Sequence, residues 1–175
     1  MSAQDIVNHA YQNGALNRFE VCWFFSHRQP SKGFMAKKIL IIDDDPDAIS
    51  FVQCILEDHG YENISSLSSI KGLEMARSEN PDLILLDLFM PEKSGISVFK
   101  ELRQDPRLNH IPVVVVSGMP QVTGVDVTTF IGRQIDPTED GVSPGLTAPD
   151  GLVDKPIDPE KLINIIKKIM REGEI

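Results

Sequence analysis

The stretch ILIIDDDPD (residues 39–47) joins four aliphatic residues to three consecutive aspartates, and a proline follows the aspartates. A short run that is apolar at every position is typical of a strand buried on both faces of a parallel sheet. Asp45 and Pro46 then match the N-cap and first-turn positions of a helix. Three adjacent carboxylates repel one another, so this strand end requires either exposure to water or a cation.

Apolar runs and amphipathic segments alternate along the chain after this stretch. Further strands are expected at 61–65, 83–86, 112–116 and 152–154. Helices are expected between Asp45 and Gly60, near 69–78, from about Ile96 to Asp105, and around Leu162, Ile165, Ile166 and Ile169. This alternation predicts an α/β fold, in which a parallel sheet is covered by helices on both faces.

Composition excludes several classes of function. The formal net charge of −9 disfavours direct binding of nucleic acid, which requires a basic surface. The longest apolar runs, such as VVVV at 113–116, are too short to span a membrane. Cys22 and Cys54 form no disulfide framework, which indicates a reducing compartment. The chain is therefore interpreted as a cytoplasmic protein with no nucleic-acid or membrane partner.

Two stretches interrupt the alternation. Residues 120–150 should contain one crossover helix, which 125–133 would supply, but 136–151 is rich in proline and glycine and predicts a long irregular loop. Residues 1–35 form an N-terminal extension before one domain at 36–172 and a tail at 173–175. Within the extension, RFEVCWFFS (18–26) would be a strand that pairs with a sheet edge or binds a partner. The favoured alternative is that Met35 is the true start of the protein.

Chemically active side chains follow the predicted strands. They are Asp43, Asp44, Asp45, Asp87, Ser117 and Lys155. Because the carboxyl ends of parallel strands meet at one edge of the sheet, these side chains should converge there. Clustered carboxylates suit Mg²⁺, which prefers oxygen ligands. A phosphoryl group on Asp87 would fit this edge, with Lys155 to neutralise it and Ser117 to donate a hydrogen bond.

In this order the residues resemble the receiver domain of two-component response regulators, over residues 36–172. The matching motifs are Asp43-Asp44, LLDLFMPEKSG (85–95) with Asp87, VVVVSG (113–118) with Ser117, and DKP (154–156) with Lys155. The resemblance implies a flavodoxin-like sheet of five parallel strands in the order 2-1-3-4-5. It also implies a cis peptide bond between Lys155 and Pro156.

The resemblance also implies roles for individual residues. Asp87 would accept a phosphoryl group from a phosphohistidine on a sensor histidine kinase or a phosphotransfer protein. Mg²⁺ would be held by Asp43, Asp44, Asp87 and the backbone carbonyl of Phe89. Such a protein is not an ordinary enzyme, because it catalyses only its own phosphorylation and dephosphorylation. With no output domain expected after the last helix, it would be a stand-alone, chemotaxis-regulator-like receiver that signals by protein–protein interaction.

The chain departs from the family pattern on the output face. Leu152 occupies the position where the family usually has a tyrosine or phenylalanine switch residue, and the stretch between Ser117 and Lys155 is longer than usual. Two alternatives stay open. One is a degenerate receiver that binds partners without phosphorylation. The other is a magnesium-dependent phosphohydrolase with an aspartate nucleophile, although Phe89 stands where such an enzyme of the haloacid dehalogenase type places its general acid.

Overall fold

The computed structural model describes residues 37–118 and 148–172. Five strands form one sheet: β1 (Lys38–Ile42), β2 (Glu62–Ser66), β3 (Leu83–Asp87), β4 (Val113–Ser117) and β5 (Gly151–Asp154). They pair in the order β2-β1-β3-β4-β5, and every pairing is parallel. The flavodoxin-like sheet expected from the sequence is confirmed.

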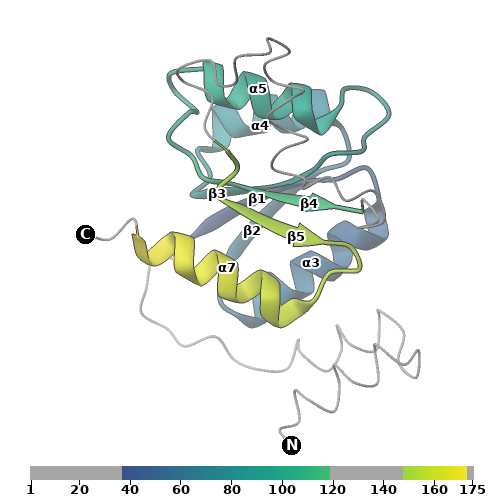
Figure 1. Cartoon of the computed structure of the whole chain (residues 1–175), viewed down its shortest axis with the longest axis vertical. Coiled ribbons are helices and arrows are strands. Elements are labelled where there is room, and N and C mark those ends of the chain that lie inside the picture. Colours follow the sequence, from purple (N-terminus) through teal and green to yellow (C-terminus); the bar gives the residue numbers. More distant parts are fainter. Residues whose placement is uncertain (1–36, 119–147, 173–175) are drawn as a thin grey trace, which may run out of the picture.

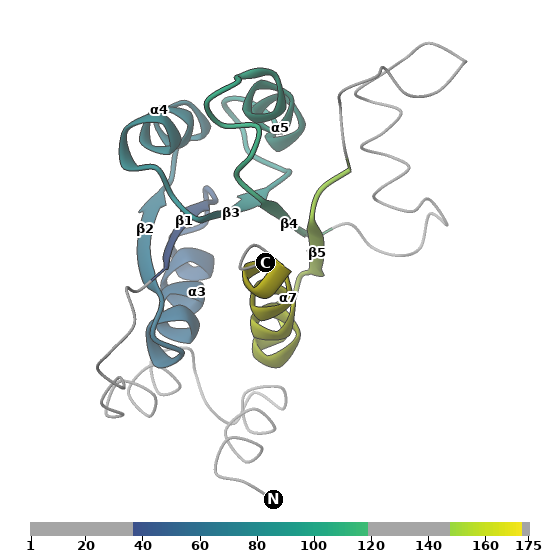
Figure 2. The same ribbon diagram turned by 90° about the vertical axis from the view of Figure 1, so that its left-hand side faces the viewer.

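Helices cover both faces of this sheet (Figure 1). They are α3 (Pro46–Asp58), α4 (Ser69–Glu79), α5 (Gly95–Gln104) and α7 (Pro159–Glu172). In the turned view, α3 and α7 lie against one face, while α4 and α5 lie against the other (Figure 2). Among the described residues, no helix combines the length and apolar character needed to cross a membrane.

The strands divide their side chains between two apolar cores. In β1, Ile39 and Ile41 pack in the core that includes residues of α3 and α7, whereas Leu40 and Ile42 pack in the core that includes residues of α4 and α5. Both sets are buried because successive side chains of a strand point to opposite faces. Two packed cores hold the central strands firmly, and the positions of their carboxyl ends follow from this packing.

The start of α3 agrees with the sequence prediction and the start of β2 differs slightly. The Asp45 carboxylate accepts a hydrogen bond from the Asp47 backbone N–H at 2.9 Å, so Asp45 is the N-cap. At the other end, the Tyr61 N–H donates to the Leu56 carbonyl at 3.0 Å. Tyr61 therefore belongs to the helix terminus, and β2 begins at Glu62 rather than at the expected residue 61.

Other expectations fall outside the described residues or need correction. The helix expected at 125–133 and the extension at 1–35 lie in the undescribed part of the chain. Gly151, which was assigned to a loop, is the first residue of β5. Cys54 is disulfide-bonded, so the expectation that the cysteines form no disulfide is wrong.

Candidate functional site

The acidic residues that follow β1 and β3 lie together at one edge of the sheet. Asp43, Asp44 and Asp87 each place one carboxylate oxygen within 4.8 Å of those of the other two. Asp43 and Asp87 are buried, whereas Asp44 is exposed. The convergence predicted from the strand ends is therefore present. Asp45 is not a member of this cluster, because it caps α3.

The Asp87 carboxyl is in an environment that disfavours its charged form. Burial raises the pKa of Asp87 above its ordinary value, and the negative charges of Asp43 and Asp44 raise it further. The positive charge of Lys155 and a hydrogen bond from the Phe89 backbone N–H lower the pKa, but they do not outweigh burial. A cation beside these carboxylates would relieve their repulsion.

Lys155 joins the cluster from the end of β5. Its Nζ donates to Asp43 Oδ2 at 2.8 Å and lies 3.6 Å from Asp87 Oδ1. Burial alone would lower the pKa of Lys155, but the hydrogen bond and charge of Asp43, together with Asp87 and Asp45, raise it above the ordinary value. The side chain is therefore a charged ammonium. The peptide bond between Lys155 and Pro156 is cis, as the resemblance implied.

The contact between Lys155 and Asp43 was not predicted from the sequence, which assigned the lysine only to an incoming anion. Both residues directly follow strands whose carboxyl ends meet at one edge of the sheet, and their opposite charges would have been the signal for this contact. Asp43 is engaged on both oxygens, since its Oδ1 accepts the Asp45 backbone N–H at 2.9 Å. Asp43 is thus held in one orientation before any ligand binds.

Two further predicted site residues are close to Asp87. Ser117 ends the neighbouring strand β4, and Phe89 lies two residues after Asp87 in the sequence. Ser117 is the buried last residue of β4, and its neighbour Val116 pairs with Asp87. The Ser117 carbonyl accepts the Lys155 backbone N–H at 2.8 Å, which joins the ends of β4 and β5. Phe89 contributes its N–H to Asp87, and its side chain is 53% exposed. The metal contact assigned to the Phe89 carbonyl stays a prediction.

A glycine allows the loop after β3 to fold back onto Asp87. The Gly95 N–H donates to the Leu88 carbonyl at 3.0 Å. A Cβ at Gly95 would lie 2.0 Å from the Asp87 carbonyl oxygen and 2.6 Å from Leu88 Cα, so only glycine fits this approach. The sequence prediction included Gly95 in a motif without giving it a role. A hydrogen bond of 2.6 Å from Ser68 Oγ to Glu92 Oε2 links this loop to the loop after β2.

Comparisons with known proteins agree with this geometry. Residues 39–123 match the family described as the response regulator receiver domain. The polar-differentiation response regulators DivK of Brucella ovis and Brucella suis are each 40% identical to this chain over 83 residues, or 47% of this chain and 68% of DivK. The family match includes Asp43, Asp44, Asp87 and Ser117, whereas Lys155 lies beyond it.

Solved structures show the same fold at low sequence identity. Chemotaxis protein CheY4 of Vibrio cholerae superposes with a TM-score of 0.62 at 22% identity, covering 77% of this chain and 98% of CheY4. A CheY-like receiver domain protein of Methanospirillum hungatei gives a TM-score of 0.63 at 23% identity, covering 79% of this chain and 97% of that protein. Both structures support the sheet order and the helix arrangement.

Proposed function

This chain belongs to the response regulator receiver domain family, and from that premise we propose that it accepts a phosphoryl group on Asp87 in two-component signalling. The observation that supports the proposal most directly is the position of Asp87. Its buried carboxylate shares one edge of the sheet with two further aspartates and the Lys155 ammonium. This set combines a nucleophile, a cation site and a fixed positive charge.

The transfer step uses groups that the chain itself supplies. A carboxylate oxygen of Asp87 attacks the phosphorus of a phosphohistidine on a histidine kinase or a phosphotransfer protein. A P–O bond forms, the P–N bond breaks, and the imidazole leaves with the electron pair. Lys155 Nζ lies 3.6 Å from Asp87 Oδ1, so it is placed to neutralise charge that develops on the phosphoryl oxygens. The Ser117 hydroxyl would donate to one of these oxygens.

The acidic cluster fits Mg²⁺ as the metal. Magnesium prefers oxygen ligands, retains several waters and commonly binds through one or two carboxylates. Asp44 and Asp87 would bind it directly, with the Phe89 carbonyl as a further ligand. By resemblance Asp43 would contact it mainly through water, and the hydrogen bonds that both of its oxygens accept hold the carboxylate in place for this role. When bound, the metal supplies positive charge against the transferring phosphoryl group.

The two alternative functions have less support. A phosphohydrolase requires a general acid near the nucleophile, and the side chain two residues after Asp87 is the apolar Phe89. A degenerate receiver would have no need to cluster Asp43, Asp44 and Asp87, or to place the Lys155 ammonium beside two of them. Phosphorylation followed by recognition of the altered surface by a partner protein accounts for the whole set.

The test is to incubate the protein with Mg²⁺ and acetyl phosphate and to measure its intact mass. We expect one added phosphoryl group on the wild type and none on Asp87→Asn. Asp47→Asn is the matched control, because Asp47 is an exposed acid in the first turn of α3 outside the cluster. A phosphoryl group that is still added to the Asp87 variant would refute the assignment.

A further inference from the structure

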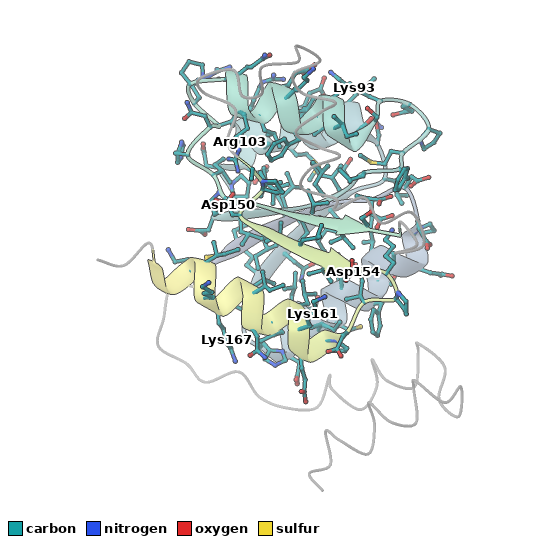
Figure 3. All side chains as sticks on the ribbon, viewed as in Figure 1. Lys93, Arg103, Asp150, Asp154, Lys161 and Lys167 are labelled. Atoms are coloured by element: carbon teal, nitrogen blue, oxygen red, sulfur yellow. The ribbon has the colours of Figure 1, made fainter. Side chains whose placement is uncertain are left out.

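A buried arginine lies at the end of the sheet opposite the acidic cluster. Arg103, in the last turn of α5, is 8% exposed. Its guanidinium donates to the carbonyls of Ile111 and Asn109 at 3.0 and 3.1 Å, and it lies 5.0 Å from the centre of the Phe99 ring. An ion pair of 2.5 Å joins its Nη2 to Asp150 Oδ2. Figure 3 shows the two residues at the start of β5, away from Asp154 and Lys161 at its other end.

Asp150 attaches the start of β5 to the start of β4 by two hydrogen bonds. Its Oδ2 accepts the Val113 backbone N–H at 2.8 Å, and its own N–H donates to the Val113 carbonyl at 2.9 Å. The same carboxylate oxygen therefore contacts both Arg103 and Val113. Because Arg103 is held by carbonyls of the loop that precedes β4, it fixes the carboxylate against that strand.

The side chains of β4 contain little information about the register of β5. β4 begins with four identical residues, Val113 to Val116, so a shift of β5 along it would meet the same side chain. β5 has only four residues and lies at the edge of the described sheet. A slip of one residue would also turn Val153 out of its core. The contact of Asp150 with Val113 distinguishes the observed register from registers in which β5 is shifted along β4.

The register of β5 determines the position of Lys155, which follows directly after the strand. One residue of slip moves a strand by about 3.3 Å. Such a movement would break the hydrogen bond of 2.8 Å from the Lys155 N–H to the Ser117 carbonyl. It would also carry Nζ away from Asp43, which it now contacts at 2.8 Å.

We propose that Arg103 and Asp150 are positioning residues that place Lys155 in the acidic cluster by fixing the register of β5. Neither residue touches the reacting groups, and their effect is transmitted along one short strand. The kinetic test of this proposal rests on the function proposed above, whereas its structural test does not.

The kinetic test is a double-mutant cycle between Asp150→Ala and Lys155→Met, with the rate of phosphorylation by acetyl phosphate as the readout. We expect Asp150→Ala to slow the wild type by about 10-fold or more, since a displacement near 1 Å can cost on the order of 10²-fold. In the Lys155→Met background the same change should have almost no effect. A purely structural role would slow both backgrounds equally, and that result would overturn the proposal.

The structural test measures hydrogen exchange at the Lys155 backbone amide and requires no phosphorylation. Asp150→Ala and Arg103→Met should each lose protection at Lys155 beyond the loss seen in Leu73→Ala, a control that removes a buried side chain of α4. Lys161→Met, which removes the exposed ion pair with Asp154, should retain it. If Asp150→Ala does not fold, Asp150→Asn takes its place in this comparison. This variant keeps an oxygen for the Val113 N–H but loses the negative charge that pairs with Arg103. Protection at Lys155 equal to the Leu73→Ala control would refute the proposal, whether or not the wild type accepts phosphate.

Discussion

Gly95→Ala is the substitution whose effect is defined most sharply by the geometry. The added Cβ would lie 2.0 Å from the Asp87 carbonyl oxygen, where real Cβ contacts are at least 3.0 Å, so the backbone must separate by at least 3.0 − 2.0 = 1.0 Å. Overpacking of this kind typically costs about 1–3 kcal/mol of stability. Because the moving atoms belong to the acceptor residue itself, a shift near 1 Å should also slow phosphorylation on the order of 10²-fold.

Gly118→Ala provides the matched control for this prediction. Gly118 follows β4 at the same edge of the sheet, but a Cβ there would lie 3.9 Å from the Lys155 side chain, an ordinary contact. Urea denaturation should show a lower midpoint for Gly95→Ala than for Gly118→Ala, and intact-mass time courses with acetyl phosphate and Mg²⁺ should show slower labelling. Equal midpoints and equal labelling rates in the two variants would show that the close approach of Gly95 has no energetic consequence.

Three further predictions concern the acidic cluster and the residue beside it. Burial raises the pKa of Asp87 above 3.8, so its unfavourable effect on folding grows as the pH rises through the folded-state pKa and is absent below the unfolded-state value. In metal-free buffer, Asp87→Asn should therefore have a higher urea midpoint than the wild type at pH 7, and the difference should disappear below pH 3.8; a lower midpoint at pH 7 would contradict the argument. Added Mg²⁺ should raise the midpoint of the wild type more than that of Asp87→Asn, since the variant lacks one of the proposed ligands. The third prediction is slow loss of phosphate, because the half-exposed Phe89 beside the acceptor cannot orient a water by hydrogen bonding. Phe89→Asn should shorten the lifetime of the phosphorylated protein, and an unchanged lifetime would show that this side chain does not control the access of water.

The sheet was predictable because its determinants are local. The apolar runs at 39–42, 83–86 and 113–116 are short and hydrophobic at every position, which favours strands of a sheet covered on both faces. Asp45 and Pro46 similarly predict the start of α3, because aspartate is favoured at the N-cap and proline at the first helical position. The predicted ends of the strands were less accurate. At Tyr61, the hydrogen bond to Leu56 belongs to the helix terminus that Gly60 forms at a φ of +78°, so the local signal was present but also covers the residue after the glycine.

Contacts between distant residues were harder to anticipate. The convergence of Asp43, Asp44 and Asp87 follows from topology, so the acidic cluster was predicted correctly. The ion pairs of Lys155 with Asp43 and of Arg103 with Asp150 join residues that are 112 and 47 positions apart, and depend on side-chain reach across the finished sheet. Asp150 also lies in the stretch 136–151, whose proline and glycine content predicted only a loop.

The charges of the cluster have a consequence for encounters in solution. Asp43, Asp44, Asp87 and Lys155 sum to −3 + 1 = −2 when all four are ionised. A negatively charged phosphoryl donor that diffuses toward this edge of the sheet is therefore repelled over a distance set by the Debye length, which is about 8 Å at physiological ionic strength. One divalent cation brings the sum to zero and removes this long-range barrier. The cluster thus makes productive collisions dependent on a cation before any bond to phosphorus begins to change, and in metal-poor solution added monovalent salt should make collisions with small anionic donors more frequent.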